Sequence, residues 1–315
     1  MKVTALAGGV GAGKFLRGLV RVVDPQDVTV IVNTGDDVTI HGLHVSPDID
    51  SVIYALAGLH DTERGWGRAG DTFRATEELR DRFGAPDAWF NLGDLDLATH
   101  LYRTMFLRND ATLSGVTALL ADKLGIAARV LPMTDDPVES WIEAVGEDGR
   151  DVFVPFQDYW VKHGARFDVK GVKYEGAADS KPAPGVLDSI EGSDALVLCP
   201  SNPVASIAPI LAVPGVREAV AARPRVVGVS PIVAGAPLRG MADRLMRGLG
   251  LDVTALGAAR VYEGLLSAWV IDERDRELAP RIEKQLGVRV GITDTIMGDD
   301  EKAAALARLA LELVS

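Results

Sequence analysis

Residues 2–20, KVTALAGGVGAGKFLRGLV, contain a short apolar run, a group of glycines and a segment with helical apolar spacing in immediate succession. A second apolar run, Val28–Val32, follows and leads into Asn33. Short apolar runs bounded by glycine are typical of buried strands, whereas the spacing between them is typical of an amphipathic helix. The segment therefore predicts a strand, a glycine turn, a helix and a second strand parallel to the first.

The glycines of this turn are candidates for phosphate binding, and we expect Gly8, Gly9 and Gly11 to contact a nucleotide. Glycine lets a backbone approach phosphate closely, and the N-terminus of the next helix favours negative charge. Neither standard motif is complete. A P-loop needs Ser or Thr where Phe15 stands, and a dinucleotide fingerprint needs glycine where Lys14 stands. The alternative is a tight strand-to-helix turn without a ligand.

Four aspartates follow the second strand in a short segment: Asp36, Asp37, Asp48 and Asp50. Carboxylates suit Mg²⁺, which proteins usually hold with one or two carboxylates together with substrate phosphates. A carboxylate in this position could also take the proton of an attacking hydroxyl. The alternative is that these residues only cap a helix or form turns, where aspartate is common.

Polar residues also follow two later apolar runs. Ala195–Cys199 leads into Ser201 and Asn202, and Arg225–Val229 leads into Ser230. Ligands of open α/β sheets bind at the carboxyl ends of the strands. We therefore expect these three residues to contact the nucleotide, although turn formation explains either segment equally well.

Alternating strands and helices predict a three-layer, Rossmann-like α/β sandwich with a mainly parallel sheet. We expect a single α/β domain over residues 1–315. A helical insertion is predicted at about residues 60–126, from three segments with helical spacing. An antiparallel extension of this sheet is predicted at about residues 139–175, from alternating segments around a Gly-Glu-Asp-Gly turn.

Composition excludes several classes of protein. The net charge of −12 argues against a general nucleic-acid-binding protein, which needs a basic surface. Cys199 is the only cysteine, so no intrachain disulfide can form and the reducing cytoplasm is the expected location. Polar residues or glycines interrupt every apolar stretch well before the ~18 residues of a membrane span. No nucleic-acid or membrane partner is therefore expected.

Longer motifs recur in one order over nearly the whole chain. They are AGGVGAGKF from Ala7, VNTGDDVTIHGLHVSPDIDS from Val32, RGWG from Arg64, LGDLDLATH from Leu92, PMTDDPV from Pro132, FQDYWV from Phe156, CPSNPVASI from Cys199, VSPIVAGAPLRGMA from Val229 and TDTIM from Thr293. Together they resemble the 2-phospho-L-lactate transferase family of coenzyme F-420 biosynthesis, whose actinobacterial members use phosphoenolpyruvate as the source of the donor. The gluconeogenesis-factor group is a more distant relative.

The resemblance implies a reaction. Its donor is a guanosine diphosphate that carries a lactyl, enolpyruvyl or glyceryl group on the terminal phosphate. Its acceptor is FO, 7,8-didemethyl-8-hydroxy-5-deazariboflavin, whose terminal ribityl hydroxyl attacks the distal phosphorus. GMP leaves, and a phosphodiester forms, which gives the zero-glutamate form of coenzyme F-420 or its dehydro form. The resemblance also implies Mg²⁺ as the ion and a homodimer as the assembly.

The resemblance assigns roles to individual positions. Asp36 and Asp50 are the expected catalytic residues. Asp36 is the first expected metal ligand, with Asp48 or else Asp50 as its partner. Asp50 and Asn91 fall where the family contacts FO; family members often carry a basic residue at the second position, so Asn91 departs from the pattern. The nucleotide is expected to contact the glycine turn and the polar segments after the later strands, namely Gly8, Gly9, Gly11, Ser201, Asn202 and Ser230.

Two other functions compete with this one. A non-catalytic nucleotide- or sugar-nucleotide-binding regulator of the gluconeogenesis-factor type would bind its ligand without converting FO. A nicotinamide-dependent oxidoreductase needs a complete glycine fingerprint and an acidic residue at the end of the second strand. Asn33 stands there instead, which argues against the oxidoreductase.

Overall fold

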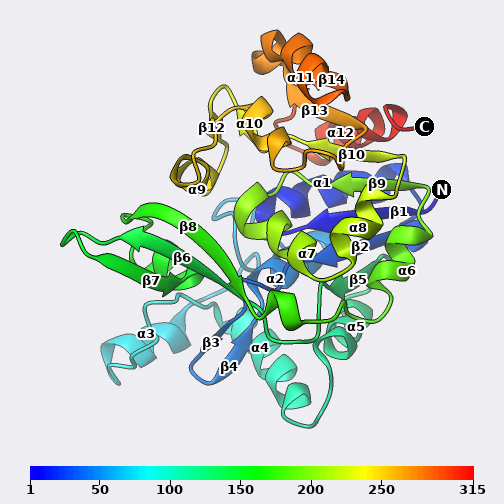
Figure 1. Cartoon of the computed structure of the whole chain (residues 1–315). Coiled ribbons are helices and arrows are strands. Elements are labelled where there is room, and N and C mark those ends of the chain that lie inside the picture. Colours follow the sequence, from blue (N-terminus) through cyan, green and yellow to red (C-terminus); the bar gives the residue numbers. More distant parts are fainter.

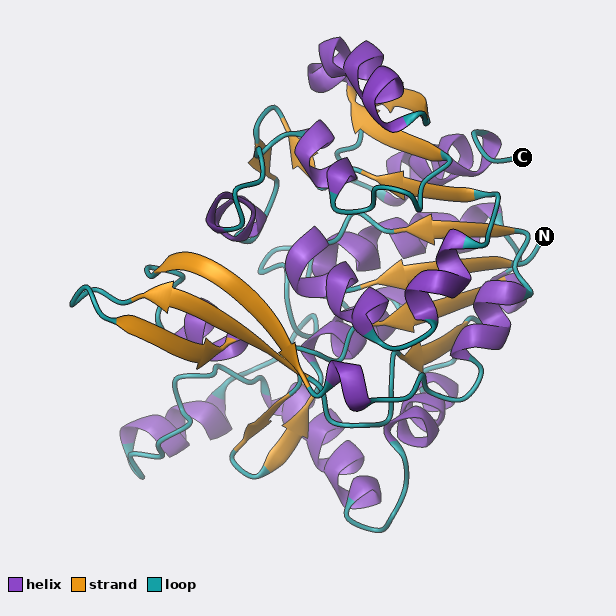
Figure 2. Ribbon diagram, viewed as in Figure 1, coloured by secondary structure: helices purple, strands orange, loops and turns teal.

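The computed structural model describes residues 1–315, and a seven-stranded sheet forms its centre (Figure 1, Figure 2). Every neighbouring pair of strands in this sheet is parallel. In spatial order the strands are β14 (Arg289–Thr293), β13 (Ala268–Asp272), β10 (Val226–Val229), β9 (Ala195–Leu198), β1 (Val3–Ala7), β2 (Val28–Val32) and β5 (Arg129–Pro132). The chain builds outward from β1 in one direction and then in the other, so the switch point of the topology lies between β1 and β9.

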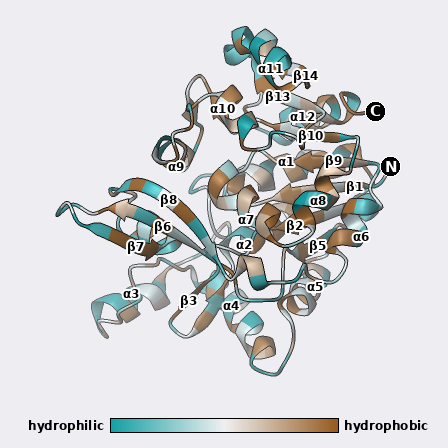
Figure 3. Ribbon diagram, in the orientation of Figure 1, coloured by the Kyte–Doolittle hydropathy of each residue, from teal (hydrophilic) through white to brown (hydrophobic).

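Helices cover both faces of the sheet, because successive strand residues point to opposite sides. Val3 and Ala5 pack on one face, and Leu6 packs on the other. The first face is covered by α1 (Gly9–Val22), α2 (Pro47–Leu56), α5 (Leu113–Lys123) and α12 (Asp300–Glu312). The second is covered by α6 (Val186–Glu191), α7 (Ala208–Ala212), α8 (Val216–Ala221), α10 (Ala255–Arg260) and α11 (Ala279–Leu286). The predicted three-layer α/β sandwich with a mainly parallel sheet is confirmed. Figure 3 shows its central strands as largely hydrophobic and the outer helix α11 as mainly hydrophilic.

The first and last helices of the chain pack closely against each other. A Cβ atom at Gly18 of α1 would lie 2.2 Å from the backbone carbon of Ala303 in α12, so only glycine allows this approach. Arg17 and Arg21 of α1 both pair with Asp300 at the start of α12, at 2.6 and 2.7 Å. The two termini accordingly lie on the same side of the molecule (Figure 1).

The predicted antiparallel segment forms a sheet of its own, which projects from the central body (Figure 1). Its strands are β7 (Asp151–Pro155), β6 (Glu139–Val145) and β8 (Asp168–Glu175), with β6 in the middle. It is not hydrogen-bonded to the seven-stranded sheet, so it does not extend that sheet as the sequence had suggested. Tyr174 attaches it to the body by donating to the carbonyl of Val204 over 2.6 Å.

The remaining elements surround the carboxyl edge of the central sheet. The hairpin β3 (Val38–Ile40) and β4 (Leu43–Val45) occupies a segment that the polar sequence did not reveal as strands. Residues 60–126 contain α3 (Arg74–Asp81), α4 (Asp94–Leu107) and α5, of which α5 packs directly on β5. The short strands β11 (Ile232–Val233) and β12 (Ala236–Pro237) precede α9 (Ala242–Gly248). None of the helices has the length and apolar character that crossing a membrane requires.

Candidate active site

A cleft of about 950 Å³ opens at the carboxyl ends of β1, β2, β9 and β10. This is the edge at which open α/β sheets bind their ligands. Of the four candidate aspartates only Asp37 is absent from the lining of the cleft. The residues that were assigned a role all line it, namely Gly8, Gly9, Gly11, Asp36, Asp48, Asp50, Asn91, Ser201, Asn202 and Ser230. Residues separated by more than two hundred positions in the chain are therefore brought to one place.

The glycines are part of a helix rather than of a separate loop. Gly8 alone joins β1 to α1, and Gly9 and Gly11 lie in the first turns of α1. A Cβ atom at Gly8 would lie 2.3 Å from Oδ2 of Asp48, and one at Gly11 would lie 2.3 Å from the carbonyl oxygen of Pro200. These glycines thus let the protein's own groups approach the helix. The first turn of this 14-residue helix still lines the cleft, and a helix N-terminus favours an anion.

Asp48 lies in the first turn of α2 and is held by Asn33. The amide of Asn33 donates to Oδ2 of Asp48 over 2.9 Å and to the carbonyl of Ala205 over 3.2 Å. Burial, together with the charge of Asp37, raises the pKa of Asp48 to about 7, against the hydrogen bond from Asn33. An ionised Asp48 is therefore destabilised until a cation lies beside it.

Asp36 shares this environment with Asp48. Its side chain is buried, its Oδ1 has no hydrogen-bond partner, and burial followed by the charge of Asp48 raises its pKa well above the usual range. No group of three or more His, Cys, Asp or Glu side chains surrounds a common point. Two carboxylates that lack a cation, in a cleft able to admit phosphates, match the ligand set of Mg²⁺. The residues present therefore fit Mg²⁺, provided that a substrate supplies further oxygens.

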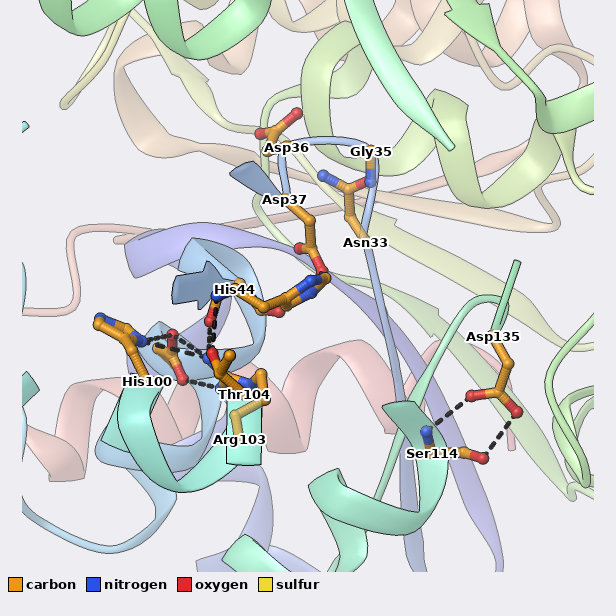
Figure 4. Close-up of polar contacts among 12 residues, drawn as sticks. Asn33, Gly35, Asp36, Asp37, His44, His100, Arg103, Thr104, Ser114 and Asp135 are labelled. Carbon is orange, nitrogen blue, oxygen red and sulfur yellow. Dashed lines mark hydrogen bonds and ion pairs between the residues drawn. The ribbon is translucent and has the colours of Figure 1, made fainter. Parts of the chain in front are cut away.

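Asp37 has a different role from its neighbour. Its Oδ2 lies 2.8 Å from Nε2 of His44 and accepts a hydrogen bond from Ser46 over 2.7 Å. Figure 4 shows the carboxylate of Asp36 directed away from this group. Asp37 does not line the cleft, so it fixes the β3–β4 hairpin and the start of α2 instead of contacting a ligand.

Asp50 is fully engaged by a buried cation. Both terminal nitrogens of Arg103 donate to its carboxylate, Nη1 to Oδ2 over 3.2 Å and Nη2 to Oδ1, and the side chain of Arg103 has no exposed surface. Nδ1 of His100 lies 3.6 Å from Oδ2 of Asp50. Burial lowers the pKa of His100 to about 4, so the ring is neutral at physiological pH. Asp50 is thus suited to orient a ligand and poorly suited to hold a metal ion.

Arg103 and His100 were not predicted as site residues. Their spacing on α4, three residues apart, places both on the face of the helix that meets Asp50. Asp96 lies on the same helix and also lines the cleft. Burial, and then the charge of Asp50, raises the pKa of Asp96 to about 6. The hydroxyl of Tyr54 is buried beside them without a hydrogen-bond partner.

Comparison with known proteins identifies the family. Residues 3–302 match the family described as 2-phospho-L-lactate transferase CofD. The chain belongs to this transferase family. Membership places it among the transferases of coenzyme F-420 biosynthesis.

Curated relatives cover almost the full length of this family member. The chain is 46% identical to the phosphoenolpyruvate transferase of Streptomyces griseus, over 99% of this chain and 98% of that protein. It is 39% identical to the 2-phospho-L-lactate transferase of Methanosarcina acetivorans, over 98% of this chain and 97% of that protein. A crystal structure of a UPF0052 family member from Bacillus halodurans has the same fold, with a TM-score of 0.66, 17% identity and 98% coverage of both chains.

In this member of the 2-phospho-L-lactate transferase family, the polar side chains predicted to contact the nucleotide already form hydrogen bonds with backbone groups of the protein. Oδ1 of Asn202 accepts from the N–H groups of Val204 and Ala205, at 3.0 and 3.1 Å. The hydroxyl of Ser230 both accepts from the N–H of Ile232 and donates to its carbonyl. Oγ of Ser201 accepts from the N–H of Gly8 over 3.2 Å. These side chains therefore shape the cleft, and the segments that carry them face it.

Three exposed apolar side chains are part of the lining of the same cleft. Trp66, Trp160 and Leu238 line it with relative exposures of 40%, 38% and 52%. Asn91 also lines the cleft and is exposed. Exposed aromatic surface inside a cleft is suited to a flat, conjugated ring.

The sequence analysis also missed the segment Thr295–Gly298, which lines the cleft. Asp272, fully buried at the end of β13, fixes this segment by accepting from the N–H and the hydroxyl of Thr295, both at 2.9 Å. Burial opposes ionisation of Asp272, but hydrogen bonds from Arg274 and Thr295 lower its pKa below the usual value. Lys14 and Arg239, two cations absent from the sequence-based prediction of the site, line the cleft as well.

Proposed function

We propose that the protein transfers a phosphoenolpyruvyl group, or a phospholactyl or phosphoglyceryl group, from its GDP-activated donor to FO. The observation that carries this proposal is the pair Asp36 and Asp48, two buried carboxylates with raised pKa values in a cleft at the N-terminus of α1. Such a site attracts a divalent cation together with phosphates. The family membership supplies the class of reaction.

In this proposal the donor phosphates lie near the start of α1, and the nucleotide contacts the segments of Gly8, Gly9 and Gly11 and those of Ser201, Asn202 and Ser230. Asp36 and Asp48 would hold Mg²⁺ against the donor diphosphate. The ion supplies neutralisation of charge that builds up on the phosphate oxygens. Phosphoryl-type transfer depends mainly on such positioning and neutralisation, and it needs no covalent nucleophile from the protein.

FO would bind against the exposed aromatic side chains of the cleft, Trp66 and Trp160, and would contact Asn91. Asp50, oriented by Arg103, accepts a hydrogen bond from the terminal ribityl hydroxyl. The hydroxyl oxygen forms a bond to the distal phosphorus, and the bond from that phosphorus to the bridging oxygen breaks. GMP leaves with the electron pair, and the hydroxyl proton passes to solvent. The product is the zero-glutamate form of coenzyme F-420 or its dehydro form.

The relatives favour phosphoenolpyruvate as the source of the donor. Relatives from Streptomyces and related genera, 40% to 46% identical, carry the name phosphoenolpyruvate transferase. The relative named 2-phospho-L-lactate transferase is 39% identical. We accordingly propose the enolpyruvyl donor first, with the protein working in the cytoplasm as a homodimer.

The test is turnover of purified protein with FO, Mg²⁺ and each of the three GDP-activated acids. The expected result is loss of FO, appearance of GMP in equal amount, and a product whose mass equals FO plus the phospho-acid minus one water. Binding of guanine nucleotide without any of these changes would favour the non-catalytic regulator. Turnover with the lactyl donor alone would keep the transferase and overturn the choice of enolpyruvyl.

A further inference from the structure

Two basic side chains in the cleft have no acidic partner. Lys14 on α1 and Arg239 in the segment before α9 both line the cleft, and neither forms a salt bridge. The contrast with the next turns of α1 is direct, because Arg17 and Arg21 both pair with Asp300. The chain has 45 acidic and only 33 basic side chains, so acidic partners are plentiful. Two cations that lack one in a cleft therefore indicate a binding site for an anionic ligand.

Arg239 is held in place without losing its capacity to bind. Its Nη1 donates to the backbone carbonyl of Arg64 over 3.0 Å. Its guanidinium lies where a side chain at Gly65 would begin, since a Cβ atom there would be 1.2 Å from Nη1. Gly65 has a φ of +79°, a conformation that favours glycine. A guanidinium has five N–H donors, so most of them stay available to a ligand.

Lys14 and Arg239 act on the same region of the cleft. Burial, followed by the charge of Arg239, lowers the pKa of Lys14. The pKa of His60 is lowered by burial and then by the charges of Lys14, Arg17 and Arg239. Two like charges are therefore close enough to repel each other, and an anion bound between them would remove that repulsion.

We propose that Lys14 and Arg239 bind the diphosphate of the donor from two separate elements, α1 and the segment before α9. This inference rests on the proposed function for the identity of the donor. Arg239 acts as the fork that fits two phosphate oxygens, and Lys14 acts as a point charge beside the N-terminus of α1. Because Arg239 also holds the carbonyl of Arg64, donor binding steadies the segment that carries Trp66.

The test measures binding of inorganic pyrophosphate with Mg²⁺ by titration calorimetry, for the wild type and for Lys14→Gln, Arg239→Gln and Arg239→Lys. Loss of one charge-assisted contact should raise Kd about tenfold or more, and lysine at position 239 should recover only part of the loss. Arg247→Gln is the matched control, since Arg247 is exposed on α9 and pairs with Asp243 over 2.8 Å. Its Kd should stay within about twofold of the wild-type value.

A double-mutant cycle tests the packing of Arg239 on Gly65. Gly65→Ala should weaken pyrophosphate binding in the wild type, and should add little when Arg239→Gln is already present. Melting temperatures confirm that each variant is folded. Unchanged pyrophosphate binding in both Lys14→Gln and Arg239→Gln overturns the inference, even if FO is converted. Weakened binding in these variants, together with a wild type that does not convert FO, overturns the proposed function and leaves this inference standing.

Discussion

Asp50 and Arg103 form a bidentate ion pair at the cleft, and the arginine side chain is entirely buried. Removal of one member of such a pair leaves an uncompensated charge in the interior. We expect Asp50→Asn and Arg103→Gln each to lower the free energy of unfolding by about 3 kcal/mol or more. Urea denaturation measures this difference. If Asp50 only capped α2, Asn would cap equally well and the change would stay below ~1 kcal/mol.

Asp36 should matter for turnover and not for stability. Its raised pKa shows that the ionised form is unfavourable in the folded protein, so Asp36→Asn should keep or raise the melting temperature. Loss of metal-based neutralisation should reduce conversion of FO by roughly a hundredfold or more. Steady-state kinetics at increasing Mg²⁺ measure the effect, and recovery at high Mg²⁺ identifies a metal ligand.

The neighbouring aspartate provides the control for this variant. Asp37 is bound by His44 and Ser46 and does not line the cleft. Asp37→Asn should therefore lower the melting temperature. Its turnover, measured at a temperature where the protein is folded, should stay close to the wild-type value. Equal loss of turnover in the two variants, with both folded, would contradict the distinction between Asp36 and Asp37.

Asp96 should make stability depend on pH. Its pKa rises from 3.8 to about 6 on folding, so its contribution to stability is complete below pH 3.8 and is lost as the pH rises through 6. Asp96→Asn should therefore be more stable than the wild type at pH 7.5, by up to ~3 kcal/mol, and similar to it near pH 4. Denaturation curves at the two pH values test this. A difference that is equal at both values would show that the carboxylate is not the cause.

Guanine nucleotide should raise the melting temperature more than adenine nucleotide does. A ligand that binds only the folded state stabilises by about 2.7 kcal/mol at a hundred times its Kd, which is several degrees in a thermal melt. The comparison uses GDP and ADP at equal concentration with Mg²⁺. Equal shifts would count against a GDP-activated donor.

The centre of the fold could be predicted from the sequence, because short buried strands and amphipathic spacing are local patterns. β1, β2, β9 and β10 fall where the apolar runs lie. The same patterns say nothing about which strands pair, so the separate sheet of β6 to β8 was read as an extension of the central one. The hairpin of β3 and β4 was missed because its alternation is short and includes polar residues.

The sequence predicted which residues line the site better than it predicted what each residue does there. Charged residues after strands mark the cleft, yet sequence spacing cannot show that Arg103 neutralises Asp50 across 53 positions. The glycines carried a second ambiguity. Glycine is needed both where phosphate approaches a backbone and where other protein groups pack closely against it. Only the structure shows that Asp48 and Pro200 lie against Gly8 and Gly11. Lys14 was noticed only as part of an incomplete motif, because its lack of a partner is a property of the folded chain.

The packing of Gly18 against Ala303 also bears on how the protein is made. α1 is synthesised long before α12, and the cleft-lining segment Thr295–Gly298 lies just before α12. Until α12 has left the ribosome, α1 lacks one of the helices that cover it and the cleft lacks part of its lining. The complete cleft therefore forms only after α12 has been synthesised, so no ligand can occupy the finished site earlier in translation.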